Sequence, residues 1–128
     1  MSVQMLVAVA AGGALGAVGR YLVMSGVGHW IGHGFPYGTL AVNLIGSFAL
    51  GALIEISALA WSPSEEMRAF LAAGVLGAFT TFSTFSMDTV VLWERGEFVG
   101  AGIYVVCSVA LGVCGLIAGM SVFRAILT

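Results

Sequence analysis

The sequence predicts an all-α integral membrane protein whose 128 residues form a single domain of four transmembrane helices. Hydrophobic residues make up 60% of the chain, charged residues only 8%, and the mean hydropathy is +1.10. Each of four apolar segments exceeds the roughly 20 residues that a helix needs to cross a bilayer. The polar links between them are short, so consecutive spans run antiparallel. The segments cover about residues 3–24, 37–61, 67–93 and 98–126.

Composition and charge exclude several classes of function. The chain has four cationic side chains, all arginine, and no basic run that follows a phosphate backbone, so nucleic acid is not an expected partner. The sequence also shows no nucleophile–base pair, no cluster of metal ligands and no nucleotide-binding loop, so we do not expect an enzyme. A lipid membrane is the one partner that the composition requires.

The arginines leave the orientation of the chain in the membrane open. Four spans place Arg68 and Arg124 on one side and Arg20 and Arg95 on the other. Because positive charge is equal on both sides, the positive-inside rule favours neither orientation. Such a chain can insert both ways, and oppositely inserted copies can pair as an antiparallel homodimer. A chain this poor in charge can also be balanced by accident.

The first apolar segment is dense in small residues. Gly12 and Gly16 have the GxxxG spacing at which membrane helices approach one another closely. Arg20 lies near the end of the segment, where its side chain either reaches the headgroups or faces an ion path. His29 and His33 lie in the link that follows, and they share a face suited to a metal only if that link is helical.

A polar stripe marks the second segment. Thr39, Asn43 and Ser47 recur every four residues and therefore share one face of a helix. The Asn43 amide cannot satisfy all its donors and acceptors locally, so we favour a role lining a path over one in interhelical hydrogen bonding. Glu55 lies nearly two turns inside the end of the segment, and it either marks an ion path or reaches the interface.

The third segment contains the most unusual stretch, residues 74–86, where glycines and hydroxyl side chains gather in the driest layer of a membrane. Each glycine lowers helix propensity by about 1 kcal/mol relative to alanine, so we expect the helix to break between about Gly77 and Ser83. A break frees backbone carbonyls, which are tolerated at that depth only against protein, water or an ion. Asp88 is open to the same two interpretations as Glu55.

The fourth segment repeats both themes. Gly115 and Gly119 are four residues apart, and so are Tyr104 and Ser108. The next position on the polar face is Gly112, which has no hydroxyl to extend the row. The predicted polar stripe on this helix is therefore shorter than the one on the second.

These residues resemble the signature blocks of the Fluc (CrcB) fluoride channels. The resemblance rests on residues 19–21, 38–48 and above all 74–86, and it extends over essentially the whole chain. It implies a bacterial inner-membrane protein that forms a dual-topology homodimer. Such a dimer has two antiparallel fluoride pores and a structural sodium ion at its centre.

Carried over by position, the resemblance implies roles for individual residues. The backbone carbonyls of Gly77 and Thr80, from both subunits, would bind the sodium ion. Phe82 and Phe85 would be pore phenylalanines, because ring edges are the positive part of an aromatic quadrupole and can face an anion. The remaining fluoride-path residues are Asn43 as the facing amide, Arg20 as a vestibule cation, and the hydroxyls of Thr39, Tyr104 and Ser108.

Two features depart from the family pattern, and two other interpretations compete with it. The family often has Glu at the position of Asp88, and Gly112 shortens the hydroxyl track.

A proton-coupled exporter of the small multidrug resistance type shares the size, the four spans and the dual topology. Exporters of that type resemble one another in a membrane-embedded glutamate on the first helix, and the first apolar segment of this chain has no glutamate. A non-transporting assembly subunit would leave the polar stripe and the broken helix unexplained.

Overall fold

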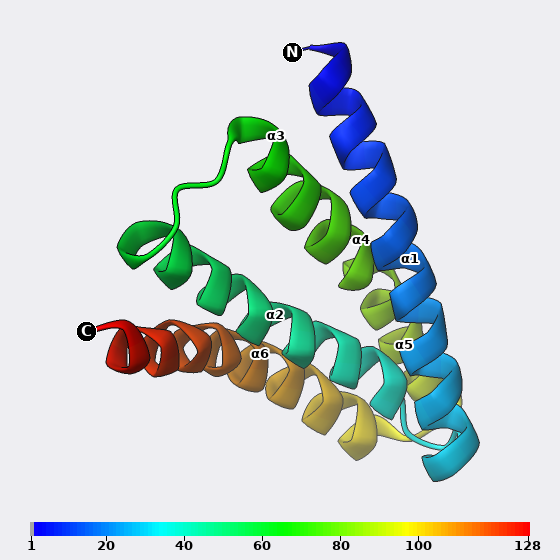
Figure 1. The fold of residues 1–128 in the computed structure, drawn as a ribbon. Helices are drawn as coiled ribbons and strands as arrows, with labels where there is room; N and C mark the ends of the chain where they lie inside the picture. Colours follow the sequence, from blue (N-terminus) through cyan, green and yellow to red (C-terminus); the bar gives the residue numbers. More distant parts are fainter. Residues whose placement is uncertain (1) are drawn as a thin grey trace.

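The structure, a computed structural model, describes residues 2–128, and within that range it contains helices and links but no strand. Four helical segments are long and apolar enough to cross a membrane, which confirms the predicted all-α, four-span fold (Figure 1). The chain is thus a multi-pass membrane protein. The segments are α1 (Val3–Ile31), α2 (Tyr37–Leu59), a composite third helix (Glu65–Glu94) and α6 (Phe98–Leu127).

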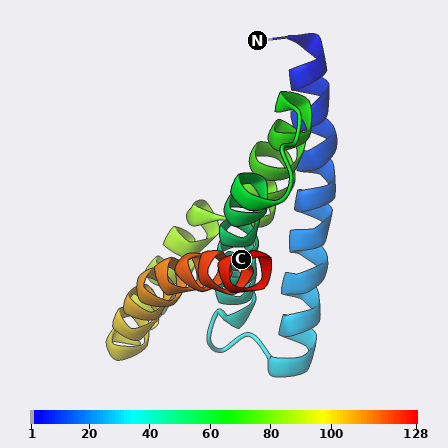
Figure 2. The same ribbon diagram turned by 60° about the vertical axis from the view of Figure 1, so that its left-hand side comes forward.

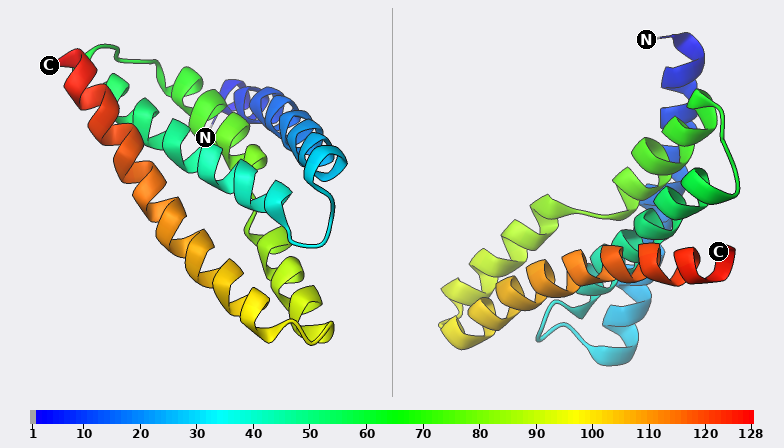
Figure 3. Two further views of the ribbon diagram at one scale, coloured as in Figure 1. Left: turned by 90° about the horizontal axis from the view of Figure 1, so that it is seen from below. Right: turned by 90° about the vertical axis from the view of Figure 1, so that its left-hand side faces the viewer.

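The third helix is built from four pieces and is interrupted near its middle. Ser64 caps its start by accepting a hydrogen bond from the Met67 amide at 3.1 Å. An extended stretch at Thr80 and Thr81 then separates its two halves, as the right-hand view of Figure 3 shows. The break falls inside the predicted stretch. The pieces are α3 (Glu65–Arg68), η1 (Ala69–Leu76, wound as a π-helix), α4 (Gly77–Phe79) and α5 (Phe82–Glu94).

The first helix is longer than the predicted segment of residues 3–24. It continues to Ile31 and ends where Gly32 adopts a φ of 95°, a left-handed conformation that glycine tolerates best. The link is therefore only residues 32–36. His29 lies inside the helix and His33 lies beyond its end, so the shared helical face considered for a metal does not form. Residues 2–128 hold no group of three or more metal-ligating side chains from histidine, cysteine, aspartate and glutamate.

The third helix changes its partner at the break. Its first half, η1 and α4, packs against α1, whereas α5 packs against α6. The most extensive contact between two helices joins α2 to α6, and Figures 1 and 2 show these two helices crossing beside each other. The break therefore lies where two helix pairs meet, α1 with η1 and α4 on one side and α2 with α6 on the other.

Glycines allow α1 to touch the backbone of η1. A Cβ added at Gly12 would collide with the carbonyl oxygen of Phe70, and one at Gly16 with that of Val75. We call this contact the α1 crossing. It confirms the close approach that the GxxxG spacing predicted.

A second glycine contact joins α2 to α6. A Cβ at Gly51 would collide with the Leu116 carbonyl, and one at Gly119 with the Phe48 carbonyl. We call this contact the α2–α6 crossing. Because the collisions involve backbone and not flexible side chains, neither helix can move aside without losing the crossing.

Large apolar side chains remain exposed on every long helix. In water such a surface would be costly, but lipid tails are as apolar as these side chains, so the exposure fits a membrane setting. The apolar interior is correspondingly small. Its buried members among the described residues are Val42, Ala52, Leu92, Ala101 and Tyr104.

Candidate functional site

The Thr81 hydroxyl satisfies a backbone group that the break releases, whereas the Thr80 hydroxyl bonds a carbonyl that keeps its helical partner. Thr80 and Thr81 have extended φ/ψ values of −85°/158° and −153°/119°. The Thr80 hydroxyl donates to the Leu76 carbonyl at 3.0 Å. The Thr81 hydroxyl accepts from the Thr84 amide at 3.3 Å and is the N-cap of α5. The hydroxyl-rich sequence therefore both weakens the helix and stabilises its cut ends.

Asn43 of α2 holds the break through two hydrogen bonds to one residue. Its Nδ2 donates to the Thr81 carbonyl at 3.1 Å, and its Oδ1 accepts from the Thr81 amide at 2.7 Å. The Asn43 side-chain amide bonds Thr81 in the way that the backbone of an adjacent β-strand would, and it satisfies both the amide and the carbonyl of Thr81. The sequence favoured a path-lining role for Asn43 over interhelical bonding. In the structure Asn43 forms interhelical bonds and also lines a cavity.

The hydrogen bonds at the break leave the carbonyls of Gly77 and Thr80 without their helical partners. In a continuous helix the amides of Thr81 and Thr84 would donate to these two carbonyls. Instead, the Thr81 amide donates to Asn43 and the Thr84 amide to the Thr81 hydroxyl. Gly77 itself is still helical, with φ −62° and ψ −37°. The two predicted sodium ligands are thus carbonyls that do not receive their helical hydrogen bonds, because the amides that would donate them bond to Asn43 and to the Thr81 side chain.

A cavity of about 310 Å³ opens beside the break, between α2 and the third helix. Gly46 makes room for the break, because a Cβ there would collide with the methyl group of Thr80. The walls combine amide, hydroxyl, carbonyl-bearing and phenyl groups, a polar lining unusual for a membrane interior. The cavity is lined by Asn43, Gly46, Ser47, Leu50, Ala72, Leu76, Gly77, Thr80, Thr81 and Phe82.

Phe82 and Phe85 lie on the first turn of α5 with their ring centroids 5.5 Å apart. Phe82 is 78% exposed and borders the cavity, whereas Phe85 is partly buried against Tyr104, centroid to centroid 5.2 Å. The structure therefore brings together three of the predicted path residues. The open face of Phe82 is available to a further helix or to a partner chain.

Asp88 joins two predicted path residues that come from different helices. Its Oδ2 accepts from the Thr39 hydroxyl at 2.6 Å and from the Tyr104 hydroxyl at 3.0 Å. Thr39 is 2% exposed and Tyr104 is fully buried. The sequence left Asp88 open between an ion path and the interface. Its observed partners place it beside the predicted fluoride path.

Ser108, one turn beyond Tyr104 on α6, has a buried hydroxyl with no hydrogen-bond partner within residues 2–128. A buried hydroxyl left unpaired costs about 1–3 kcal/mol, so such a group is a candidate for contact with a ligand. Further along α6, Ser47 Oγ lies 3.9 Å from where a Cβ at Gly112 would begin. Gly112 has no hydroxyl of its own, but the Ser47 hydroxyl of α2 lies next to it.

Arg20 does not simply extend to the headgroups. Its Nε donates to the carbonyl of Ala78 at 3.0 Å, in the last turn before the break. It also lines a second cavity of about 530 Å³ at the end of α1. The arginine therefore adds positive charge next to the broken helix and satisfies one of its released carbonyls.

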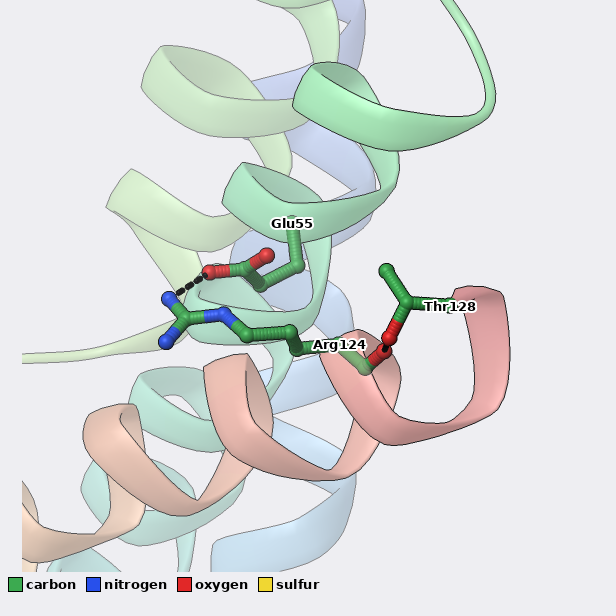
Figure 4. Close-up of polar contacts among 3 residues, drawn as sticks. All are labelled: Glu55, Arg124 and Thr128. Atoms are coloured by element: carbon green, nitrogen blue, oxygen red, sulfur yellow. Dashed lines mark hydrogen bonds and ion pairs between the residues drawn. The ribbon is translucent and has the colours of Figure 1, made fainter.

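Glu55 pairs with Arg124, as Figure 4 shows, and lies twelve residues along α2 from Asn43, the residue that bonds to the break. Arg124 Nη2 is 2.5 Å from Glu55 Oε1, and the Glu55 side chain is 7% exposed against 60% for Arg124. Thr128 also donates to the backbone carbonyl of Arg124. The sequence left Glu55 undecided, and the structure assigns it to a contact between α2 and the end of α6.

Comparison with known proteins gives one consistent result. Residues 7–120 match the family described as CrcB-like protein, Camphor Resistance (CrcB). A protein of Rhodospirillum centenum named fluoride-specific ion channel FluC is 53% identical over 94% of this chain and 96% of its own length. Proteins of the same name from Nitrobacter winogradskyi and Chelativorans sp. are each 50% identical, over 94% and 95% of this chain and 96% and 98% of their own lengths.

Proposed function

The chain belongs to the CrcB family, and on that basis we propose that it is a fluoride-specific ion channel that lets fluoride leave the bacterial cell passively across the inner membrane. The observation that carries the proposal is the identity of about half of all residues, over nearly the whole chain, with proteins named as such channels. The family is one of ion channels, so the chain is not assigned an enzymatic activity.

The geometry supports a path for a small, hard anion beside the break. Such an anion must exchange its water for other donors and for the positive edges of dipoles. The path we propose is bordered by the Asn43 amide, the Phe82 and Phe85 rings, and the guanidinium of Arg20. The path continues past Thr39, Tyr104 and Ser108. Because Thr39 and Tyr104 donate their hydroxyl hydrogens to Asp88, the buried, unpaired Ser108 hydroxyl is the donor that is free for fluoride.

The functional unit that we propose is an antiparallel homodimer with one pore for each orientation. Equal numbers of arginines on the two sides support dual topology. The exposed Phe82 ring, which borders the cavity at the break, supports a partner chain there. In such a dimer, Phe82 would contribute to a path lined partly by the other copy.

A structural sodium ion fits the carbonyls released at the break. Carbonyls at the C-terminal end of a half-helix and in unwound backbone at membrane depth are suited to sodium. Gly77 supplies the first kind and Thr80 the second, because the amides that would bond them in a helix bond elsewhere. Two carbonyls from each copy would surround one ion on the two-fold axis. Its positive charge would also offset the cost of bringing fluoride to the middle of the membrane.

The exporter of the small multidrug resistance type is the alternative, and it is not favoured. Its transport depends on a membrane-embedded glutamate in the first helix, and no acidic residue lies in α1. The buried Glu55 is in α2 and is paired with Arg124.

Fluoride efflux from liposomes tests the proposed function. Purified protein is reconstituted in vesicles loaded with potassium fluoride, and external fluoride is followed with a fluoride electrode after valinomycin is added. We expect rapid efflux that needs valinomycin, and far slower chloride efflux from matched vesicles. Equal chloride and fluoride rates would overturn fluoride specificity, and a flux driven by an imposed proton gradient would favour the exporter.

A further inference from the structure

The cavity at the end of α1 contains two side chains able to carry positive charge and no carboxylate. Its volume is about 530 Å³, larger than the cavity at the break. Arg20 comes from α1, and His33 comes from the link that follows it. The complete lining is Ala17, Arg20, Tyr21, Met24, Ser25 and His33.

The backbone holds the His33 ring in a defined place. α1 ends at Gly32, whose φ of 95° turns the chain back along the helix. The imidazole then lies against Gly28, and a Cβ at Gly28 would collide with the ring atom Cε1. Gly28 is buried although the ring that covers it is exposed. A glycine notch in α1 thus positions a ring that is still open to water.

Arg20 connects this cavity to the broken helix. Its Nε is bonded to the Ala78 carbonyl, two residues before Thr80. The terminal amino groups of Arg20 form no hydrogen bond or ion pair within residues 2–128. They remain available to an anion that enters the cavity from water.

Few other titratable groups face the His33 ring. From α1 these are Arg20 and the Tyr21 phenol, both in the cavity wall. On the other side of the link, Arg95 Nη1 donates to the Gly34 carbonyl at 3.3 Å and lies 3.8 Å from Glu97 Oε2. Glu97, which lines a pocket with Gly34 and Phe35, is therefore next to an arginine, and no carboxylate from the lining of the Arg20 cavity offsets a charge on His33.

We propose that His33, when protonated, adds a second positive charge beside Arg20, the vestibule cation that the family resemblance implies, and so concentrates fluoride at the mouth of the path. This inference rests on the proposed channel function. Histidine is the side chain whose charge ordinarily changes between about pH 5 and pH 8. The vestibule therefore recruits anions more strongly in acid than at neutral pH.

The test is the fluoride current through the purified channel in a planar bilayer, perfused on both sides from about pH 7.5 to about pH 5.5. Current is carried by fluoride ions and not by neutral hydrogen fluoride. One unit charge roughly 8 Å away in water raises the local anion concentration about twofold, so the wild-type current should rise about twofold in acid. The current through the His33→Gln channel should be the same at both pH values and should equal the wild-type current at neutral pH.

Two further variants separate a charge effect from a general disturbance. Gly28→Ala keeps His33 but displaces its ring from the notch, so its current should lose most of the acid-induced rise. His29→Gln removes the other histidine, which is exposed on α1 and stacks edge-on against Trp30 with centroids 5.6 Å apart. That control should keep the full rise.

The outcomes distinguish this inference from the proposed function. If no variant and no wild-type channel carries fluoride current, the channel proposal fails. If wild-type and His33→Gln channels carry current with the same ratio between the two pH values, the vestibule role of His33 is overturned and the channel function stands. An acid-induced rise that His29→Gln abolishes would also overturn it.

Discussion

The glycine crossings and the break at Thr80 and Thr81 bring helices together in opposite ways. At the α1 crossing, backbone lies directly on backbone, with no polar side chain between Gly16 and Val75. At the break, backbone groups leave their own helix and bond to side chains of Asn43, Thr81 and Arg20. The crossings therefore fix the positions of helices, whereas the break supplies polar groups at membrane depth. Changes at the first should act on stability, and changes at the second on ion flux.

The largest effect is expected at the α1 crossing. Gly16→Ala places a methyl group against the Val75 carbonyl, and backbone there cannot yield, so we expect a loss of about 3 kcal/mol or more in stability. The measurement is the apparent melting temperature of the detergent-solubilised protein, together with its elution profile. Gly13→Ala is the matched control, because nothing lies within 4 Å of its added Cβ. Equal behaviour of the two variants would contradict the crossing.

Asn43→Ala should have the next largest effect, and it should act mainly on flux. It removes both hydrogen bonds to Thr81 and leaves backbone groups unpaired, a destabilisation of about 1–3 kcal/mol. The change also removes an amide donor from the proposed path, and a loss of about 1.4 kcal/mol in fluoride stabilisation there corresponds to efflux lowered about tenfold. Ser47→Ala is the control, because Ser47 lines the same cavity without a hydrogen bond in residues 2–128. A Ser47 defect as severe as that of Asn43 would contradict the special role of the amide.

The phenylalanines should show a purely functional defect. Phe82→Ile and Phe85→Ile keep apolar bulk but lose the ring edge, and an aromatic contact of this kind contributes about 0.5–1.5 kcal/mol. We expect fluoride efflux to fall roughly fivefold with little change in melting temperature. Phe98→Ile serves as the control, because that ring packs on Trp93 and not at the cavity. Unchanged efflux in both path variants would return Phe82 and Phe85 to the role of apolar filler.

Glu55→Gln should have the smallest effect. The pair with Arg124 is largely open to solvent on the arginine side, so its loss should lower stability by less than about 1 kcal/mol. Efflux should be unchanged, because the pair lies apart from the break. Melting temperature and efflux measured on one preparation test both statements. A severalfold drop in efflux at wild-type stability would make Glu55 part of the ion path.

The contrast between crossing and break also explains what the sequence could predict. Gly12 and Gly16 predict a close contact because their spacing is local and any helix places them on one face. Glycines and hydroxyls predict the break for the same local reason. The helix runs past the predicted span of residues 3–24, because it tolerates Gly26 and Gly28 and ends only where Gly32 turns left-handed.

Contacts between residues that are far apart in the sequence could not be predicted from local sequence patterns. Asp88 lies 49 residues from Thr39 and 16 from Tyr104, and only the fold shows that one carboxylate accepts from both. Glu55 and Arg124 are 69 residues apart, so their pairing had no local signal either. The face shared by Thr39, Asn43 and Ser47 was the one hint that partners would converge on α2.

The most direct test of the break as the functional centre is an experimental structure of the purified protein in lipid with sodium and fluoride present. We expect two antiparallel copies whose third helices cross at Thr80 and Thr81. Ion density should lie between the Gly77 and Thr80 carbonyls of both copies, at coordination distances that fit sodium. Continuous third helices, or breaks that face lipid with no ion density between copies, would contradict the central role of this stretch.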